Sequence, residues 1–242
     1  MEISVTKTNL DAIAALRVLF LQENNFQFVY NKCHQYGWAD EWVFTIGGEQ
    51  IGYGAVWGKD KREDRDTIFE FYLLPAYRKF AGIIFQQFYK SANTAYVECQ
   101  TNDALLSSML YQFCKDINAE AILFKEHFTS SLQMPDVVFK KNVDDKTGAE
   151  DGYALEHEGE IVATGGFVWN YNLPFIDMYY DVVEQHRRKG LGSFITQELK
   201  KEAYRMQRVP AARCNINNHA SKATLLKAGM QVCGHIVIGQ IK

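Results

Sequence analysis

The sequence is poor in proline, has no close cysteine pairs and contains no long apolar run. Its 242 residues include 4 prolines and 5 cysteines. No Cys-x-x-Cys occurs, which argues against a zinc site, and an odd number of cysteines argues against a disulfide framework. No stretch approaches the roughly 18 uninterrupted apolar residues of a membrane span, and no secretory signal is recognisable. We therefore expect a cytoplasmic protein without a metal centre or a membrane partner.

Charge gives no sign of a nucleic acid partner either. The chain has 26 Lys and Arg against 29 Asp and Glu, for a net charge of -3. Proteins that bind nucleic acids usually carry a basic excess, so we expect no nucleic acid partner. Hydrophobic residues make up 47% of the chain, which is enough for a buried core. The length is large for one domain and small for two average ones.

Two segments with the pattern of a β-hairpin suggest an internal repeat. Residues 47–57 and 158–168 each place a glycine-containing turn beside an apolar run. Gly54 and Gly165 take equivalent places, 165 − 54 = 111 residues apart. After each hairpin come an aromatic strand, a short basic loop and a helix. The sequence therefore predicts two related α/β halves.

The predicted elements follow the same order in both halves. In the first half they lie at 68–74, 75–79, 82–92, 96–100 and 104–114, with closing strands at 121–124 and 137–139. In the second half they lie at 176–183, 184–189, 192–207, 211–215 and 221–228, with closing strands at 230–233 and 235–241. An asparagine, Asn102 or Asn218, precedes the last helix of each half. Only the first half opens with a strand at 3–6 and a helix at 9–22, which Asn9 is expected to cap.

An acidic, glycine-containing stretch at 144–152 separates the two halves. Such composition is typical of a linker. We therefore predict a first domain at 1–143 and a second domain at 153–242, whose N-terminal part is abbreviated.

The sharpest motif is Arg187-Arg188-Lys189-Gly190-Leu191-Gly192, between a predicted strand and a predicted helix. The start of a helix exposes unpaired N–H groups and a partial positive charge, which favour a phosphate. Gly190 and Gly192 have no Cβ, so the backbone can approach an anion closely. The pattern predicts a loop that holds a diphosphate. A glycine-rich turn with solvated basic side chains is the alternative.

With this loop, the second half resembles the Gcn5-related N-acetyltransferases (GNAT). In that family a strand ends in a Val-x-Pro-like turn, followed by Gln/Arg-x-x-Gly-x-Gly/Ala and a long helix. A later Asn-x-x-Ala/Ser opens a second helix that ends near Gly-Phe. The corresponding segments here are Val182–Glu184, Arg187–Gly192, Asn218–Ser221 and Gly229–Met230. The resemblance covers about 153–242.

The first half resembles a degenerate copy of the same domain. Its loop is Arg78–Ile83, in which Ala81 aligns with Gly190 and Ile83 aligns with Gly192. Cβ atoms at both places would obstruct a phosphate, so we predict that the cofactor binds the second half alone. For both domains, the resemblance implies an α/β fold with a mixed, mostly antiparallel central sheet flanked by helices.

The resemblance also implies acetyl-CoA, or another acyl-CoA, as the co-substrate. The loop backbone would hold the diphosphate, and the end of the strand would pair with the pantetheine arm like an added strand. In the family a bulge splays this strand from its neighbour and directs an N–H at the thioester carbonyl. The implied cofactor-binding residues are Val182, Val183, Arg187, Arg188, Lys189, Gly190, Leu191, Gly192, Ser193, Asn218 and Ser221.

Acyl transfer to an amine needs a base, because an amine of pKa ~10.4 is mostly protonated at neutral pH. Asp177, Tyr179 and Asp181 alternate along the predicted strand and therefore share one face. They are the catalytic candidates, with the aspartates as possible bases or as ordinary solvated side chains. The family often has an acid tyrosine seven residues after the motif asparagine, where this chain has Leu225. Tyr179 or Tyr180 would replace it, or the thiolate leaves toward water.

These features predict an N-acetyltransferase that moves an acetyl group from acetyl-CoA to the primary amine of a small molecule. Aromatic residues of the first half, at 26–30, Trp38 and Trp42, are candidates for the wall of the acceptor site. One alternative is a non-catalytic acyl-CoA-binding or regulatory protein. Another is a transferase that uses aminoacyl-tRNA, against which the net charge of -3 argues. The sequence predicts no oligomeric state.

Overall fold

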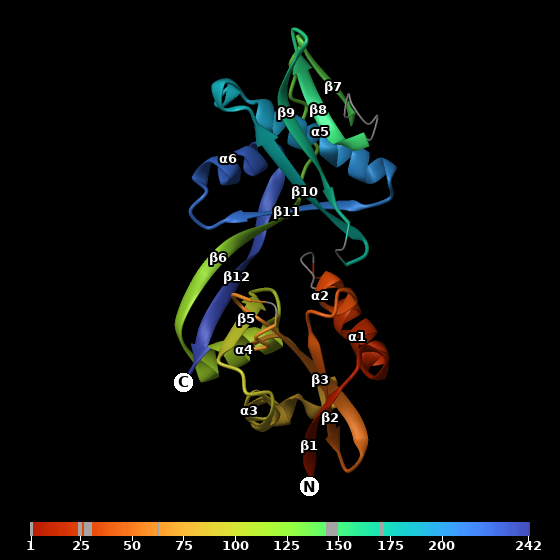
Figure 1. Ribbon diagram of the computed structural model, residues 1–242, viewed down its shortest axis with the longest axis vertical. Coiled ribbons are helices and arrows are strands. Elements are labelled where there is room, and N and C mark those ends of the chain that lie inside the picture. Colours follow the sequence, from red (N-terminus) through yellow and green to blue (C-terminus); the bar gives the residue numbers. More distant parts are fainter. Residues whose placement is uncertain (1, 24–25, 27–30, 62, 144–149, 170–171) are drawn as a thin grey trace. The chain divides into compact units, whose positions relative to one another are not determined.

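The computed structural model describes residues 2–23, 26, 31–61, 63–143, 150–169 and 172–242 (Figure 1). The chain divides into two compact units. Unit 1 consists of Met1–Glu120 and Gly234–Lys242, and unit 2 consists of Ala121–Cys233. Each unit has its own hydrophobic core.

A mostly antiparallel sheet with the strand order β1-β2-β3-β4-β5-β12 forms the centre of unit 1. Its strands are β1 (Ile3–Thr8), β2 (Asp40–Ile46), β3 (Glu49–Trp57), β4 (Thr67–Leu73), β5 (Tyr96–Gln100) and the unit 1 part of β12 (Met230–Ile241). Its helices are α1 (Leu10–Glu23), α2 (Asn31–Gln35), the 3-10 helix η1 (Pro75–Phe80), α3 (Ala81–Ser91) and α4 (Ala104–Phe113). Only the β4–β5 pair among these neighbours is parallel.

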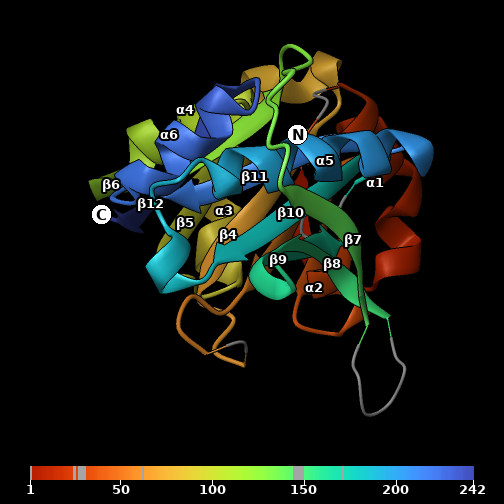
Figure 2. The ribbon, with the colours of Figure 1, turned by 90° about the horizontal axis from the view of Figure 1, so that it is seen from above.

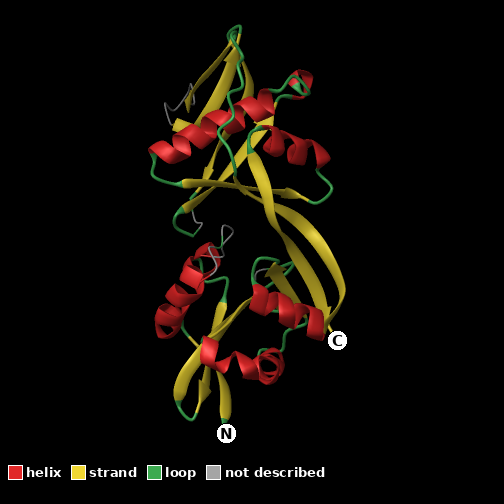
Figure 3. Ribbon diagram, turned by 180° about the vertical axis from the view of Figure 1, so that it is seen from behind, coloured by secondary structure: helices red, strands yellow, loops and turns green. Residues whose placement is uncertain are grey.

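Helices cover both faces of this sheet (Figure 3). Helix α1 begins after Asn9, whose side chain accepts a hydrogen bond from the Ala12 N–H at 3.1 Å, as the sequence predicts. Its apolar stripe packs on Val43, Tyr53 and Tyr72. The residues that alternate with these three point to the opposite face, where α3 and α4 pack.

In unit 2 the strands follow the order β6-β11-β10-β9-β8-β7 and are again mostly antiparallel. Its strands are the unit 2 part of β6 (Cys114–Glu126), β7 (Val137–Val143), β8 (Glu150–His157), β9 (Glu160–Val168), β10 (Phe175–Val182) and β11 (Val209–Asn215). Its helices are the 3-10 helix η2 (Glu184–His186), α5 (Leu191–Arg205) and α6 (His219–Lys227). Helix α5 lies over β8, β9 and β10 (Figure 2). The mixed, mostly antiparallel α/β fold of both units confirms the predicted fold class.

Both predicted hairpins are present, and their turns have the backbone that the glycines suggest. Gly47 and Gly48 have φ values of 58° and 86°, and Glu158 and Gly159 have 51° and 82°. Two successive left-handed residues are the mark of the type I′ turn that suits the twist of paired strands.

The closing strands pair differently from the prediction. Residues 121–125 of β6 pair with β11, and β7 pairs with β8, so both strands belong to unit 2 rather than to the first half. Residues 236–240 of β12 pair with β5 in unit 1. The contact units therefore differ in extent from 1–143 and 153–242, which stay a prediction about sequence domains. Of the predicted linker, residues 144–149 lie outside the described residues, and 150–152 belong to β8.

An irregular segment, 127–136, takes the place of the N-terminal helices that the second half was expected to lack. Two buried side chains of α5 hold it. Gln197 accepts a hydrogen bond from the Leu132 N–H at 2.7 Å and donates one to its carbonyl at 3.1 Å. The ammonium of Lys200 donates to the carbonyls of Phe128 and Ala228, each at 2.8 Å, and lies 2.8 Å from a carboxylate oxygen of Glu126.

Replacement of Lys200 is expected to destabilise unit 2. Lys200→Met keeps the apolar stem but leaves a carboxylate and two carbonyls without their cation, which costs about 3 kcal/mol for a buried pair. The neighbouring Lys201 is exposed and pairs with Glu198, so Lys201→Met should change the free energy of unfolding by less than about 0.5 kcal/mol. Urea unfolding of both variants measures the difference, and equal losses would contradict this view of Lys200.

Candidate active site

The loop between β10 and α5 has the backbone of an anion-binding turn. Arg188 and Gly190 have φ values of 64° and 87°, so two left-handed residues interrupt the chain just before the helix. Gly190 is the N-cap of α5 and has no side chain to cap it, and the first helical hydrogen bond runs from Phe194 to the Gly190 carbonyl at 3.1 Å. The amides of Leu191, Gly192 and Ser193 therefore lie in the uncapped first turn, an arrangement that suits a phosphate.

Gly192 has a second reason to be glycine. A Cβ at this place would lie 3.0 Å from the Thr224 side chain and 3.3 Å from the Tyr180 ring. Close packing of α5 against α6 and β10 therefore requires the missing Cβ, besides any approach of an anion. The Ser193 hydroxyl donates to the Thr224 carbonyl at 3.1 Å, so its backbone N–H is the donor left for a ligand.

The three basic residues of the loop divide into one that shapes it and two that face solvent. The Arg187 Nε donates to the Val182 carbonyl at 2.9 Å, and its guanidinium lies 3.6 Å from Asp181. Arg78 makes the same bond in unit 1, to the carbonyl of Leu73 at 3.2 Å. Arg187 therefore fastens the loop to the end of its strand.

Beside the loop, strands β10 and β11 diverge. They pair in parallel only from Phe175 to Asp177 and from Val209 to Ala211. Beyond that point β10 pairs with β9 alone, and β11 pairs with β6. We call this divergence the fork. Beyond the paired residues, the edge of β10 that faces away from β9 has no strand partner among the described residues, and such an edge is where an extended chain can add.

The backbone groups that face the fork follow from the β9–β10 ladder. The Val183 N–H donates to Val162 at 3.1 Å, and its carbonyl accepts from the His186 N–H at 2.8 Å. Both backbone groups of Val183 thus have partners within the chain, and the pairing of Val183 with the pantetheine arm stays a prediction. Alternation along an antiparallel strand turns Tyr180 and Val182 toward the fork instead.

The bulge that the resemblance implies is not found in β10, since the register with β9 is regular from Asp177 to Val182. Divergence of the strands opens the fork without it. A register shift occurs in unit 1 instead, where Ala55 pairs with Glu70 and Val56 with Ile68. Phe69 is the extra residue of that bulge.

The three catalytic candidates are spread along one face of β10. Asp177, at the fork, is 6% exposed and lies 3.7 Å from the Arg213 guanidinium. Asp181, at the loop end, has a side chain 78% exposed. Four residues separate the two carboxylates by about 13 Å along the strand, so they cannot serve the same amine. The Tyr179 hydroxyl lies over Gly166, 2.7 Å from where a Cβ would stand.

The opposite face of β10 carries Tyr180, the other tyrosine that the sequence offers in place of the family's acid. The Tyr180 hydroxyl lies 3.1 Å from the Ser221 hydroxyl of α6. Burial raises the pKa of Tyr180, although the hydroxyl groups of Ser221 and Thr224 oppose the shift. Leu225 is buried, at 2% exposure, in the core of unit 2. The Asn218 side chain caps α6 through the Ser221 N–H at 3.0 Å.

Unit 1 lacks the anion-binding turn. Its counterpart loop is the 3-10 helix η1, which runs directly into α3, and no positive φ occurs in the described residues 75–92. A continuous helix offers no concave set of amides. The residue that caps α4 is Asp103, which follows Asn102, since the Leu106 N–H donates to the Asp103 side chain at 3.0 Å. A carboxylate thus stands where unit 2 has Asn218.

Unit 1 contains a buried network of ion pairs on the face of its sheet that α1 covers. Arg17 holds the Glu70 carboxylate through two nitrogens at 2.9 and 3.2 Å, and His34 lies between Glu70 and Glu41 at 3.2 and 2.8 Å. Burial alone would raise the pKa of Glu70, but Arg17 and His34 outweigh it and lower this pKa. Glu70 is therefore committed to the network and is not available as a base.

Asp103→Asn is expected to stabilise unit 1 at alkaline pH. Burial raises the pKa of Asp103 from 3.8 to about 7, although hydrogen bonds from the amides of Leu106 and Leu105 lower it in part. The native state thus favours the protonated form, and the wild type loses stability as pH rises from about 4 through 7. Asparagine caps a helix equally well and does not ionise. The free energy of unfolding of the variant should therefore exceed that of the wild type by on the order of 2–4 kcal/mol at pH 8 and by little at pH 4.

Thermal unfolding at both pH values measures this difference. The exposed Asp116 has a φ of 50°, which asparagine also tolerates, so Asp116→Asn is the matched control. Lower stability of Asp103→Asn than of the wild type at pH 8 would contradict the argument.

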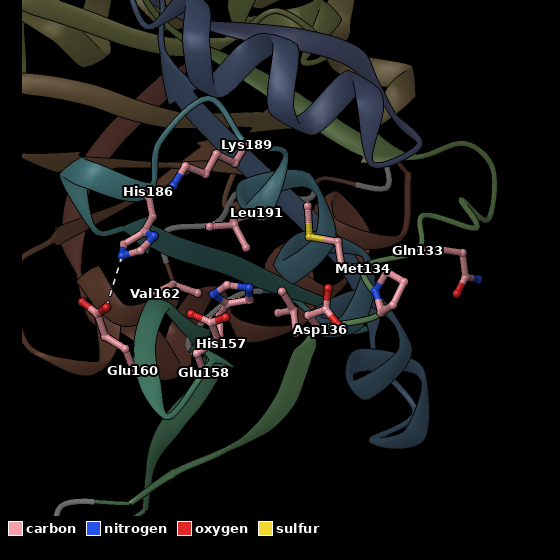
Figure 4. A pocket seen from close by; sticks show the side chains of 12 residues that line it. Gln133, Met134, Asp136, His157, Glu158, Glu160, Val162, His186, Lys189 and Leu191 are labelled. Carbon is pink, nitrogen blue, oxygen red and sulfur yellow. Dashed lines mark ion pairs between the residues drawn. The ribbon is translucent and has the colours of Figure 1, made fainter.

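A pocket of about 570 Å³ lies beside the loop, between segment 133–137, the β8–β9 turn and the start of α5. Lys189 and Leu191 line it from the loop side (Figure 4). Asp136, Glu158 and Glu160 give it an acidic rim, and Glu160 lies 3.5 Å from the His186 ring. The lining also includes His157, His186 and Lys189, so its charge is mixed, and it shares Lys189 and Leu191 with the loop before α5.

None of the helices in the described part of the chain is long and apolar enough to cross a membrane. No group of three or more His, Cys, Asp or Glu among the described residues is placed to hold a metal ion.

The sequence matches two family models. One, described as acetyltransferase (GNAT) family, matches residues 115–230, and the other, described as acetyltransferase (GNAT) domain, matches residues 9–127. Among curated proteins, no sequence matches this chain.

Solved structures share the fold over the whole chain. An acetyltransferase of the GNAT family from Colwellia psychrerythraea has a TM-score of 0.77 at 14% identity, with 100% of both chains covered. A GCN5-related N-acetyltransferase from Sphaerobacter thermophilus has a TM-score of 0.63 at 12% identity, covering 99% of this chain and 96% of that one. A tandem GNAT protein from the clavulanic acid biosynthesis pathway has a TM-score of 0.59 at 12% identity, with 99% and 98% covered. At such identities the likeness concerns the fold alone.

Proposed function

Because this chain belongs to the GNAT family of acetyltransferases, we propose that it transfers an acetyl group from acetyl-CoA to the primary amine of a small molecule, with a single active centre in unit 2. The observation that carries this proposal is the turn with left-handed Arg188 and Gly190 before α5, which unit 1 replaces by a continuous helix.

The residues of unit 2 fit acetyl-CoA in two places. The amides of the first turn of α5 would bind the diphosphate, since they point out of the helix start with no capping side chain. Lys227 adds positive charge there, with its ammonium 3.8 Å from the Cβ position of Gly190. Along the fork, the backbone groups of Tyr180 and the N–H of Val182, whose carbonyl accepts from Arg187, would pair with the pantetheine arm, which directs the thioester toward Asp177.

Asp177 is the better placed of the two candidate bases. It stands where the strands part, and the Arg213 guanidinium balances its charge. In the proposed reaction the Asp177 carboxylate takes a proton from the bound ammonium, and the neutral amine attacks the thioester carbonyl. Asp181 is paired with Arg187 at the far end of the strand and serves the loop.

For the acceptor we propose only a chemical class, the primary amine of a small molecule. Of the aromatic residues expected to wall its site, 27–30 lie outside the described residues, and Trp38 and Trp42 belong to unit 1. A net charge of -3 favours a cationic small molecule over a nucleic acid partner. We further expect that the protein acts in the cytoplasm.

The test is thiol release from acetyl-CoA in the presence of a panel of primary amines. We expect release of CoA that depends on one class of amine and is absent without amine. Tight binding of acetyl-CoA with no thiol release on any amine would favour a non-catalytic acyl-CoA-binding protein, the alternative that the buried Leu225 supports.

A further inference from the structure

The pocket beside the loop before α5 has the size and the floor of a site for a small molecule. Its volume of about 570 Å³ falls within the range of roughly 300–1,000 Å³ that is typical of ligand pockets. Its floor is apolar. Val162 and Leu191, which are 1% and 5% exposed, belong to the core of unit 2, and the half-buried Met134 and Val137 pack against that core. Charged side chains stand around this floor (Figure 4).

Three of these charges have no partner within the described part of the chain. Lys189 lies on one side of the pocket, and Asp136 and Glu158 lie on the other (Figure 4). No hydrogen bond or ion pair joins any of these three side chains to another described residue. Glu160, in contrast, lies 3.5 Å from the His186 ring. The pocket therefore offers two carboxylates and one ammonium with which a bound molecule can pair.

This combination of charges restricts the chemistry of the ligand. A simple anion would meet two carboxylates, and a simple cation would leave Lys189 without a counter-ion. A neutral apolar molecule would remove water from all three charges without pairing them, which costs free energy. We propose that the pocket binds a small zwitterion with an apolar body, of the amino acid or dipeptide class. Its ammonium pairs with Asp136 and Glu158, its carboxylate pairs with Lys189, and its apolar part covers the floor.

The pocket is separate from the proposed active centre. Val162 lies opposite Val183, whose N–H donates to the Val162 carbonyl at 3.1 Å. Val183 follows Asp177 by six positions, which corresponds to about 20 Å along an extended chain. A zwitterion bound in the pocket is therefore not the acceptor that Asp177 would deprotonate, and the site goes beyond the proposed function.

The pocket adjoins the anion-binding turn, so its ligand acts as an effector of acetyl-CoA binding. Lys189 and Leu191 belong to both, and the Met134 methyl group lies 3.2 Å from the Cβ position of Gly190. A carboxylate paired with Lys189 takes that positive charge from the diphosphate and adds a negative charge beside it. Zwitterion and acetyl-CoA should therefore weaken each other's binding by the same factor, because coupling between two sites is reciprocal. This coupling rests on the proposed function, whereas binding of the zwitterion does not.

The test is calorimetric titration of the full chain with leucine and with leucyl-leucine, in the absence of acetyl-CoA. We expect at least one of the two to bind. Its N-acetyl derivative, which lacks the ammonium, and its C-terminal amide, which lacks the carboxylate, should each bind at least about 10-fold more weakly, as expected for loss of a hydrogen-bonded charge. The double variant Asp136→Asn, Glu158→Gln should weaken the zwitterion by a similar factor. It should not weaken the N-acetyl derivative, which also shows that the variant is folded.

Two further measurements complete the test. Glu120→Gln, at an exposed position of β6, is the matched control and should leave binding of the zwitterion unchanged. Saturating acetyl-CoA should weaken the zwitterion about 5-fold or more. No binding of either probe, or derivatives that bind as tightly as the zwitterion, overturns the site. Binding that acetyl-CoA leaves unchanged or strengthens overturns the coupling. Failure of acetyl-CoA alone to bind overturns the proposed function, while binding of the zwitterion still supports the pocket.

Discussion

Gly190→Asp is expected to abolish acetyl-CoA binding by this chain. The substitution places a carboxylate at the N-cap of α5, in contact with the amides that we propose to hold the diphosphate. Two like charges about 4 Å apart at a protein surface repel each other by several kcal/mol, which corresponds to a loss of at least about 100-fold in affinity. Calorimetric titration with acetyl-CoA measures the effect.

Two control variants distinguish the effect of charge from that of backbone strain, and a site in unit 2 from one in unit 1. Gly190→Asn introduces a side chain of the same shape without charge, and asparagine tolerates the left-handed backbone, so it should weaken binding far less. Lys79→Asp places the same charge on the exposed counterpart loop of unit 1 and should leave binding unchanged. Equal losses in Gly190→Asp and Lys79→Asp would contradict a single site.

Asp177→Asn is expected to lower the turnover number by about 100-fold or more, since a general base contributes about 10²–10⁴-fold. Binding of acetyl-CoA should stay within about twofold, because the amide does not reach the loop. The measurement is the pH dependence of turnover, in which the variant should lose the acidic limb that reports the base.

Comparison of carboxylates makes this test specific. Asp181→Asn removes the partner of Arg187 and should act mainly through the Michaelis constant for acetyl-CoA. Glu120→Gln, at an exposed position of β6, is the control for a lost surface charge. A larger fall in turnover for Asp181→Asn than for Asp177→Asn would reverse the assignment of the base.

Local signals in the sequence are sufficient for most elements. The strand predicted at 96–100 and the helix predicted at 104–114 are found at Tyr96–Gln100 and Ala104–Phe113. Both hairpin turns and the Asn9 cap follow from residues that favour one backbone conformation. The loop before α5 was likewise marked by its glycines, because Gly190 adopts a φ that other residues rarely take.

Pairing partners are not encoded locally. Residues 121–124 and 137–139 read correctly as strands, but their alternation carries no information on which sheet they join. The cap of α4 is likewise not fixed by residue type, since Asn102 and Asp103 can both cap a helix and Asp103 does so.

The side-chain geometry of the fork could be predicted only in part. Period-two alternation places Asp177, Tyr179 and Asp181 on one face and so separates Tyr179 from Tyr180. It could not show that Tyr180 reaches Ser221, or that both backbone groups of Val183 are paired, because these contacts bring together residues of different elements.

The most direct test of the account is hydrogen–deuterium exchange of the full chain with and without CoA. A diphosphate held by the start of α5 should slow exchange at the amides of residues 188–194 and leave those of residues 79–84 unchanged. Protection of 79–84, or no protection of 188–194 at saturating CoA, would contradict it.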